Sequence, residues 1–321
     1  MKEQLLKSKQ VEAGNAVKVF APATVANLVC GFDVLGMALH KPQDLMGVQL
    51  TDRPGISIRH TDGYQLPVEP AKNVAGAALL ALLEEADTPF GFEVTIDKRI
   101  KPGSGLGSSA ASSAGVVVAA NHLLGHIFTN EDLVRFAMNG EKVASGVKHA
   151  DNIAPAIYGG ITLIRSIFPL DIVQLTAPPL YVTVVHPQIE VRTSDARQIL
   201  RKEVQLKSAI RQWGNIAGLV TGFLKNDYGL IGRSLEDVII EPVRSMLIPG
   251  FDDVKKHSKE AGALGGGISG SGPSIFMLSK EESTAQQVEY AMTEVYVKLG
   301  IEFKTYVTTI SYEGVKVMDA E

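Results

Sequence analysis

The sequence predicts an α+β protein with two domains, and three observations lead to this. The 321 residues suffice for two hydrophobic cores, and 45% hydrophobic with 21% charged residues is an ordinary soluble-globular composition. Short apolar strand patterns alternate with amphipathic helix patterns along the chain. Residues 168–179, FPLDIVQLTAPP, carry three prolines and are expected to link the domains. We expect a polar N-terminal extension at 1–16, a first domain at 17–168 and a second at 169–321.

Charge and cysteine content exclude several kinds of protein. The formal net charge of −4 provides no broad basic surface for nucleic acid. Cys30 is the only cysteine, so no intramolecular disulfide is expected, and this fits a cytoplasmic location. Residues 1–14 lack the apolar stretch of a signal peptide, and no apolar run is long enough to span a membrane. We therefore expect a cytoplasmic protein that binds neither nucleic acid nor membranes.

The first part of the chain contains the elements that lead to a glycine-rich loop. Strand patterns cover 17–21, 47–50, 56–59 and 92–100, with a Pro54-Gly55 turn before the third, and a helix pattern covers 73–86. Between the first two strands, the segment 22–39 places Asn27 and Asp33 among small and apolar residues, and Gly31 and Gly36 interrupt any simple period. Such polar residues either hold a turn or belong to a site.

The most unusual stretch is KPGSGLGSSAASSAG at 101–115, where a glycine-serine loop runs into an alanine-rich helix. Gly103, Gly105 and Gly107 allow positive φ and a close approach of backbone N–H groups to a ligand, and Ser108 or Ser109 is expected to cap the helix. The free amides and the dipole at a helix N-terminus favour a phosphate there. The alternative is an ordinary helix start. The spacing matches neither a Walker A loop nor a dinucleotide-binding fingerprint.

Further polar residues precede the expected link. Thr129 and Asp132 have capping-box spacing and predict a helix that runs to about residue 145. Glu141 lies near its C-terminal end, where the helix dipole is unfavourable, so its carboxylate is either solvated or compensated by a cation. His149, Asp151 and Asn152 then crowd a single turn before a strand at 161–164; they either hydrogen-bond that loop or form part of a site.

The second half shows the same alternation. Strand patterns cover 181–185, 275–278 and 305–310, and helix patterns cover 207–224, 230–238, 253–261 and 285–299. Arg197 lies in the first turn of another helix capped by Ser194 or Asp195, so it either reaches an anion or faces solvent. The glycines at 265–272 follow a helix and precede a strand, the reverse of the dinucleotide-binding order. We expect this backbone to approach a ligand or the first glycine loop closely.

Together, these stretches resemble one family. KVFAPATVANLVCGFDVLGMAL, KPGSGLGSSAASSAG and GGISGSGPSIFML look like the three signature motifs of the GHMP small-molecule kinases. Within that superfamily, the K-H-A-D-N-x-A-P-A-x-x-GG and I-E-P-x-R segments are similar to the homoserine kinases. The resemblance implies ATP-dependent phosphorylation of L-homoserine in threonine biosynthesis, by a homodimer. It also implies an N-terminal domain like the second domain of ribosomal protein S5, a C-terminal α+β domain, and an active site between them.

The resemblance also implies the site residues. ATP would be held by Pro102, Gly103, Ser104, Gly105, Leu106, Gly107, Ser108, Ser109 and Ala110, and Mg²⁺ by Ser109 and Glu141. Homoserine would be held by Asn27, Asp33, His149, Asn152, Thr193, Arg197 and Arg244, of which Asn152, Arg197 and Arg244 are the catalytic candidates. Asn152 occupies a position where other members carry an aspartate, unless Asp151 is the equivalent residue. The alternatives are a kinase for another small molecule, such as mevalonate, and a nucleotide-sensing module without turnover.

Overall fold

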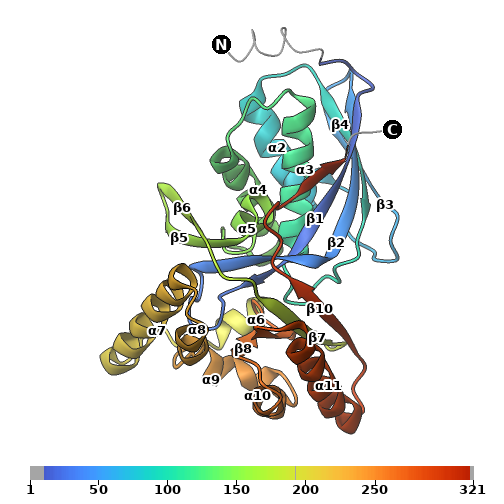
Figure 1. Ribbon diagram of the computed structural model, residues 1–321. Coiled ribbons are helices and arrows are strands. Elements are labelled where there is room, and N and C mark those ends of the chain that lie inside the picture. The colour runs from blue at the N-terminus through green and yellow to red at the C-terminus, as the bar shows by residue number, and fades with distance from the viewer. Residues whose placement is uncertain (1–10, 192, 319–321) are drawn as a thin grey trace.

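The computed structural model describes residues 11–191 and 193–318 of the chain and confirms the predicted α+β class (Figure 1). The first of its two sheets has the strand order β11-β1-β2-β4-β3. Its strands are β1 (Ala16–Ala26), β2 (Leu35–Thr51), β3 (Ile56–His60), β4 (Gly91–Asp97) and β11 (Lys316–Met318). β3 pairs in parallel with β4, whereas the other neighbours on this path are antiparallel.

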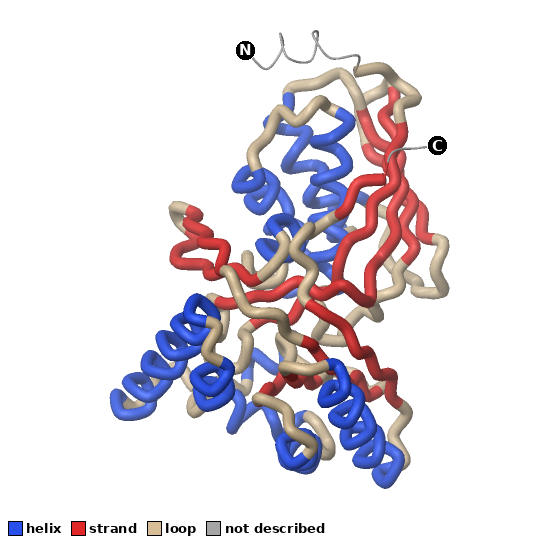
Figure 2. Tube along the Cα trace, viewed as in Figure 1, coloured by secondary structure: helices blue, strands red, loops and turns tan. Residues whose placement is uncertain are grey.

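Helices pack on one face of this sheet, as Figure 2 shows. They are α2 (Val74–Ala86), α3 (Ser108–Leu123), α4 (Asn130–Ser145) and α5 (Ile153–Tyr158). α3 lies against β1 and β2, and its small residues permit this close approach. A Cβ at Gly115 would lie 2.0 Å from Met46 Cε and 3.2 Å from Ala21 Cβ, so a larger residue there would require the Met46 side chain to move. The alanine-rich sequence therefore seats the glycine loop directly over the end of the sheet.

A hairpin of β5 (Ile161–Ile167) and β6 (Leu170–Leu175) extends the first sheet, because β5 pairs with β2. Part of the expected linker is thus a strand, and residues 168 and 169 lie at the tip of this hairpin. β11 returns to the first sheet from the end of the chain. We therefore propose that the domains divide between Leu175 and Tyr181, with the last strand belonging to the first domain.

The second sheet has the antiparallel order β10-β7-β9-β8. Its strands are β7 (Tyr181–Pro187), β8 (Gly265–Ile268), β9 (Ile275–Ser279) and β10 (Phe303–Thr309). α10 (Phe251–Glu260) and α11 (Glu282–Leu299) pack on it, and Val288, Met292 and Tyr296 join Ile275 and Met277 in a separate core. This arrangement brings the glycines of β8 toward the first domain.

Shorter elements complete the described chain. They are α6 (Thr193–Gln198), α7 (Leu206–Lys225), α8 (Tyr228–Ser234), α9 (Glu241–Arg244) and the 3-10 helices η1 (Pro70–Lys72) and η2 (Ser245–Leu247). None of the helices within the described ranges is long and apolar enough to cross a membrane. The Thr129 capping box is confirmed at the start of α4. The helix expected to end at 238 instead ends at Ser234.

Candidate active site

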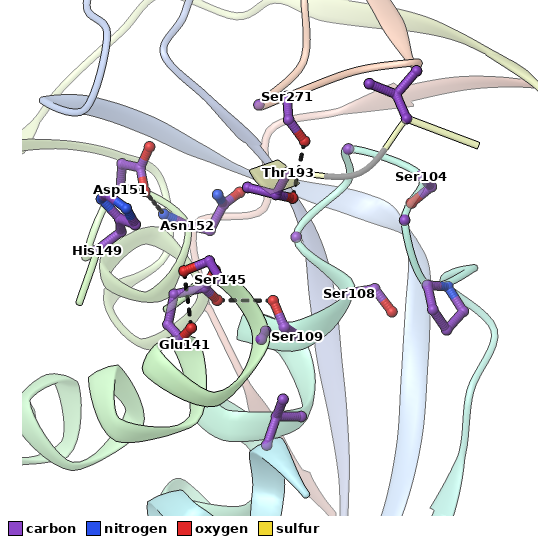
Figure 3. Close-up of a pocket in the computed structure, with 18 of the residues that line it drawn as sticks. Ser104, Ser108, Ser109, Glu141, Ser145, His149, Asp151, Asn152, Thr193 and Ser271 are labelled. Carbon is purple, nitrogen blue, oxygen red and sulfur yellow. Dashed lines mark hydrogen bonds between the residues drawn. The ribbon is translucent and has the colours of Figure 1, made fainter. Parts of the chain in front are cut away.

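A cavity of about 480 Å³ lies between the two sheets and is lined by residues of both domains (Figure 3). Its lining includes Asn27, Asp33, Pro102, Gly103, Ser104, Gly105, Gly107, Ser108, Ser109, Glu141, His149, Asp151, Asn152, Thr193, Arg197 and Arg244. All the expected substrate and metal residues thus meet in one place. Of the expected ATP residues, Leu106 and Ala110 do not line the cavity, because both side chains are buried in the hydrophobic core.

The glycine loop ends at Gly107, which is the N-cap residue of α3 with a φ of 66°. The expectation that Ser108 or Ser109 caps this helix was wrong, and no side chain caps it. Ser108 Oγ instead donates to the Ile100 carbonyl at 2.7 Å. A Cβ at Gly107 would lie 1.9 Å from Thr24 Oγ1, so both backbone conformation and space require glycine. The first-turn amides of α3 therefore face the cavity without a side-chain cap to occupy them.

The three glycine-bearing stretches contact one another. Ser269 Oγ donates to the Gly105 carbonyl at 2.7 Å, and a Cβ at Gly105 would lie 2.6 Å from the carbonyl oxygens of Ser269 and Gly272. Asn27 Nδ2 donates to the Gly270 carbonyl at 2.9 Å. The expected close approach of 265–272 to the first loop is confirmed. The glycines let two domains meet backbone to backbone at the cavity.

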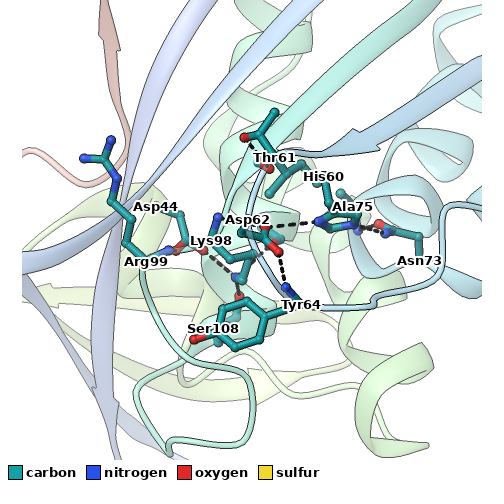
Figure 4. Close-up of polar contacts among 12 residues, drawn as sticks. Asp44, His60, Thr61, Asp62, Tyr64, Asn73, Ala75, Lys98, Arg99 and Ser108 are labelled. Atoms are coloured by element: carbon teal, nitrogen blue, oxygen red, sulfur yellow. Dashed lines mark hydrogen bonds and ion pairs between the residues drawn. The ribbon is translucent and has the colours of Figure 1, made fainter. Parts of the chain in front are cut away.

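A buried network supports the loop from below (Figure 4). Lys98 Nζ contacts the Asp44 carboxylate and donates to the Ser108 carbonyl at 2.6 Å and to Ser112 Oγ at 3.0 Å. Burial lowers the pKa of Lys98, whereas the Asp44 carboxylate raises it. Asp62 Oδ2 accepts from the Lys98 backbone N–H at 3.0 Å and lies 3.4 Å from His60 Nδ1. The start of α3 is therefore held by Asp44 on β2 and by Lys98, which directly follows β4.

Glu141 projects from α4 toward the start of α3. Ser109 Oγ donates to Glu141 Oε2 at 2.8 Å. Ser145 Oγ donates to the Glu141 backbone carbonyl at 3.0 Å, as Figure 3 shows. Burial raises the pKa of Glu141 above its usual value, and the Ser109 hydrogen bond opposes this only in part. The Glu141 side chain is half-buried in the cavity wall, and no cation pairs with its carboxylate among the described residues.

Two arginines and one aspartate surround Phe32 at the other end of the cavity. Arg197 Nη2 donates to both carboxylate oxygens of Asp33, at 2.9 and 3.0 Å. Arg244 Nε donates to the Ala196 carbonyl at 3.0 Å, and its Nη1 donates to the Gly270 carbonyl at 3.1 Å. The guanidinium carbons of Arg197 and Arg244 lie 5.4 and 4.9 Å from the Phe32 ring centre. Both positive charges are thus fixed in orientation on one aromatic platform.

Other polar groups complete this end. Asn27 Oδ1 accepts from the Asp33 backbone N–H at 3.1 Å, and both residues have positive φ, 73° and 61°. Such strained backbone in a non-glycine segment is typical of functional sites. His149 Nδ1 lies 3.8 Å from Asp33 Oδ1, and burial lowers the pKa of His149. Thr193 Oγ1 lies 3.2 Å from Ser271 Oγ.

Two buried polar atoms in this wall lack a hydrogen-bond partner among the residues that the structure describes. They are Arg197 Nε and His149 Nε2. A buried polar atom without a partner costs about 1–3 kcal/mol. Both side chains line the cavity, so a polar ligand bound there is the natural source of the missing hydrogen bonds.

Asn152 and Asp151 differ in position despite being neighbours. Asn152 Oδ1 accepts from Thr24 Oγ1 at 2.7 Å and lies close to Gly107, so its amide belongs to the floor beside the glycine loop. Asp151 is buried, and its Oδ1 accepts from the Asn152 backbone N–H at 3.1 Å. Burial, together with the negative charges of Asp33 and Glu141, raises the pKa of Asp151 to about 7.

Several residues at the cavity were not identified from the sequence. Thr24 and Phe32 lie inside the first signature stretch but were not singled out, although their placement beside Asn27 and Asp33 was the available signal. Lys98 belongs to the strand pattern that enters the loop, where a lysine at a half-buried position was the only indication. Its partner Asp44 is distant in sequence, so no local signal could have paired them.

Comparisons with known proteins agree with this site. Residues 73–160 match the family model described as the GHMP kinases N terminal domain, and residues 219–298 match the GHMP kinases C terminal model. A protein named homoserine kinase from Chloroherpeton thalassium is 48% identical over 93% of this chain and 98% of its own. A homoserine kinase from Chlorobium phaeobacteroides is 44% identical over 94% and 99% of the two chains.

Solved structures are similar as well. The crystal structure of a homoserine kinase from Cytophaga hutchinsonii superposes with a TM-score of 0.91 at 50% identity, covering 95% of this chain and 98% of that one. Mevalonate kinase from L. major, at 16% identity and a TM-score of 0.69 over 91% and 95% of the chains, shares the fold alone. Identity of this degree over nearly the whole length identifies the chain as a kinase and a member of the homoserine kinase family within the GHMP kinases.

Proposed function

We propose that this enzyme transfers the γ-phosphoryl group of ATP to the side-chain hydroxyl of L-homoserine, the step that feeds threonine synthesis. The observation that carries the proposal is the cavity itself, with an amide-lined glycine loop at one end and an Asp33, Arg197 and Arg244 cluster at the other. One end suits a triphosphate and the other suits a zwitterionic amino acid. The reacting groups would meet between them.

The nucleotide end is supported by the geometry of residues 102–110. Gly103, Gly105 and Gly107 line the cavity and have positive φ, a conformation in which backbone N–H groups can form a concavity for an anion. The 16-residue helix α3 adds the positive end of its dipole. Phosphoryl transfer needs positioning and charge neutralisation more than covalent help, and this loop supplies both.

Mg²⁺ fits the donor set beside the loop. A half-buried carboxylate, Glu141, lies next to the hydroxyl of Ser109 without a compensating cation among the described residues. Mg²⁺ is commonly bound by one or two carboxylates together with substrate phosphates, so these two oxygen donors suffice on the protein side. When bound, the ion would neutralise charge on the phosphate oxygens.

The substrate end suits homoserine better than an uncharged or purely anionic alcohol. Asp33 offers a carboxylate for an ammonium group, and Arg197 and Arg244 offer guanidinium groups for a carboxylate. Arg197 and Asp33 neutralise each other in the described structure, and a zwitterion would supply both of them with counter-charges. His149 and Thr193 border the same space, and Asn27 holds the Asp33 loop in place.

Asn152 orients the substrate hydroxyl without accepting its proton in this mechanism. Its amide oxygen is occupied by Thr24 Oγ1, which leaves the amide N–H groups as donors, and an amide is not a base at neutral pH. In a loose transition state the hydroxyl stays weakly acidic until late, so a phosphate oxygen can receive the proton. Asp151 is the competing candidate for a base, because its pKa of about 7 suits proton transfer at neutral pH.

A coupled ADP-release assay with a substrate panel tests the proposed function. L-homoserine should support turnover well above that with D-homoserine, L-serine or mevalonate, because mevalonate has no ammonium group to pair with Asp33. A preference for mevalonate would contradict the proposal. ATP binding without ADP release, whichever acceptor is supplied, would favour the nucleotide-sensing module.

We also propose that the enzyme works in the cytoplasm as a homodimer. The cytoplasmic location is supported by Cys30, the one cysteine, which is a buried free thiol. The homodimer is supported by the apolar outer face of α7.

A further inference from the structure

Helix α7 has two apolar faces, and only one of them is covered by the rest of the chain. The inner face buries Ala209, Leu219 and Phe223. The outer face is a continuous stripe, which we call the α7 stripe. The α7 stripe consists of Leu206, Ile210, Trp213, Ala217, Val220 and Leu224, of which Val220 lies at the edge of the stripe and is partly buried against the core of its own chain. Its four largest side chains are 67%, 57%, 59% and 57% exposed, for Leu206, Ile210, Trp213 and Leu224 respectively.

The spacing of the α7 stripe is that of a helix-pairing seam. Its members follow one another at intervals of four, three, four, three and four residues, which is a heptad a/d pattern along nearly the whole 20-residue helix. No charged residue interrupts the stripe, and the helix's Lys207, Arg211 and Lys225 all lie off it. A helix that is exposed only to water has no need of such a pattern on its outer face.

The stripe is complementary to itself under a two-fold axis. Two antiparallel copies centred near residue 215 place Leu206 opposite the partner's Leu224, and Ile210 opposite the partner's Val220. Trp213 then faces the partner's Ala217, so the largest side chain meets the smallest. Alternation of large and small residues across facing helices is what close packing requires. An isologous two-fold contact is also the commonest way in which identical chains associate.

The area of the stripe matches the needs of a stable dimer. Half-exposed side chains of this size present roughly 100 Å² each, so the four large ones give roughly 400 Å² per subunit and roughly 800 Å² in total. Interfaces are about 60% apolar, so this apolar area corresponds to a contact of about 1,300 Å². Specific complexes bury about 1,200–2,000 Å². The stripe alone therefore accounts for the apolar part of a standard interface.

Hydrogen bonds from the inner side of α7 to the rest of the chain hold the helix, and with it the α7 stripe, in place. Gln212 Nε2 donates to the Cys30 carbonyl at 2.8 Å and to Asp237 Oδ1 at 3.0 Å. Asn215 Nδ2 donates to the Glu236 carbonyl at 2.8 Å. The contact with Cys30 also reaches the loop that carries Phe32 and Asp33. Figure 1 shows α7 at the periphery of the molecule, away from the helices of the first domain.

We propose that the α7 stripe is the dimer interface of this enzyme, with α7 of one subunit packed antiparallel on α7 of a second copy. The inference rests on the homodimer proposed above and assigns it a surface. It predicts that tryptophan fluorescence reports on association, because Trp213 is the only tryptophan of the chain and would be buried in the dimer but exposed in the monomer.

Sedimentation velocity and tryptophan emission of the full chain, each over a dilution series, test the proposal. The variant Ile210→Glu places a charge in the seam and keeps a good helix former. An unpaired buried charge should weaken association by about 100-fold or more. Tyr290→Glu is the matched control, because Tyr290 is a similarly exposed apolar residue on α11. Far-ultraviolet circular dichroism checks that both variants fold.

We expect a wild-type dimer with blue-shifted emission that moves to the red on dilution, a monomeric Ile210→Glu variant with red-shifted emission, and an unaltered Tyr290→Glu dimer. A wild-type monomer at all concentrations would overturn both the homodimer and this surface. A dimer that Ile210→Glu leaves intact, with emission typical of exposed tryptophan, would overturn the surface alone. If Ile210→Glu fails to fold, the emission of the wild-type protein over the dilution series tests the surface, because only burial of Trp213 in the dimer would shift it. Turnover with ATP and homoserine is measured separately. An absence of turnover would contradict the proposed reaction and leave the proposed interface unaffected.

Discussion

Replacing Glu141 by glutamine should make the protein more stable and nearly inactive. The change keeps the size and shape of the side chain and an oxygen that can accept from Ser109 Oγ, at present 2.8 Å away. It removes a half-buried negative charge for which the described structure contains no cationic partner. Burial makes that charge unfavourable for folding, while the proposed role in neutralising phosphate charge makes it necessary for turnover.

Both effects have an expected size or sign. Loss of one preorganised electrostatic contact to a transition state typically costs about 10²–10³ in turnover, or about 2.7–4 kcal/mol of barrier. Because burial raises the pKa of Glu141, ionisation opposes folding, and the penalty grows as pH rises through and above the usual value of a glutamic acid. The melting temperature of Glu141→Gln should equal that of the parent in acid and exceed it at neutral pH.

Thermal unfolding without nucleotide or metal, and turnover with ATP, Mg²⁺ and homoserine, measure the two effects. Glu131→Gln is the control on the same helix, because Glu131 lies in the exposed first turn of α4, where the dipole favours a negative charge. That variant should lose a few tenths to about 1 kcal/mol of stability and keep its turnover. Near-normal turnover of Glu141→Gln, or lower stability at neutral pH, would refute the reasoning.

Three further changes give distinct outcomes. Gly107→Ala should lower the free energy of unfolding by about 2–5 kcal/mol in chemical denaturation, because the new Cβ would displace Thr24 Oγ1 and strain a positive φ. The same variant should bind ATP much more weakly in calorimetry. Gly103→Ala has open space around its Cβ and should lower the free energy of unfolding by only about 1–2 kcal/mol. Asp151→Asn should be more stable than the parent above pH 7 by up to about 4 kcal/mol, with the difference vanishing below about pH 4, since the pKa of Asp151 is raised from 3.8 to about 7. Its turnover should stay within about 10-fold of the parent, whereas a loss near 10³ would make Asp151 the base. Arg244→Lys should raise KM for homoserine by about 10–100-fold with little change in KM for ATP, because a lysine ammonium cannot form the two parallel hydrogen bonds of a planar guanidinium. An unchanged KM for homoserine would remove Arg244 from the substrate site.

Local sequence patterns predicted the elements that flank the site, because those elements have local causes. The helix expected at 73–86 forms at Val74–Ala86 with Asn73 as its N-cap, and the Thr129 capping box forms as its spacing predicts. The glycines at 265–272 indicated close backbone contact, and they do contact the first loop. The residues chosen for the substrate and metal sites all line one cavity, because the signature stretches that contain them meet at the domain interface.

Features that depend on distant contacts could not be predicted in the same way. β3 pairs in parallel with β4, although the turn at 54–55 favoured no particular partner, and β6 forms within a stretch whose prolines indicated a linker. The pairing of Lys98 with Asp44 joins two strands and leaves no local pattern. The helix pattern at 207–224 showed an amphipathic helix but could not tell that one apolar face would be buried and the other left at the surface.

The central claim is that the cavity joins a triphosphate to the hydroxyl of a zwitterionic amino acid. Phosphorus NMR of a reaction containing ATP, Mg²⁺ and L-homoserine tests it most directly, because the spectrum identifies the atom that receives the phosphoryl group. We predict one phosphate monoester on the side-chain oxygen of homoserine for each ADP formed. ADP accompanied only by inorganic phosphate, or a phosphate on the carboxylate of homoserine, would contradict the claim.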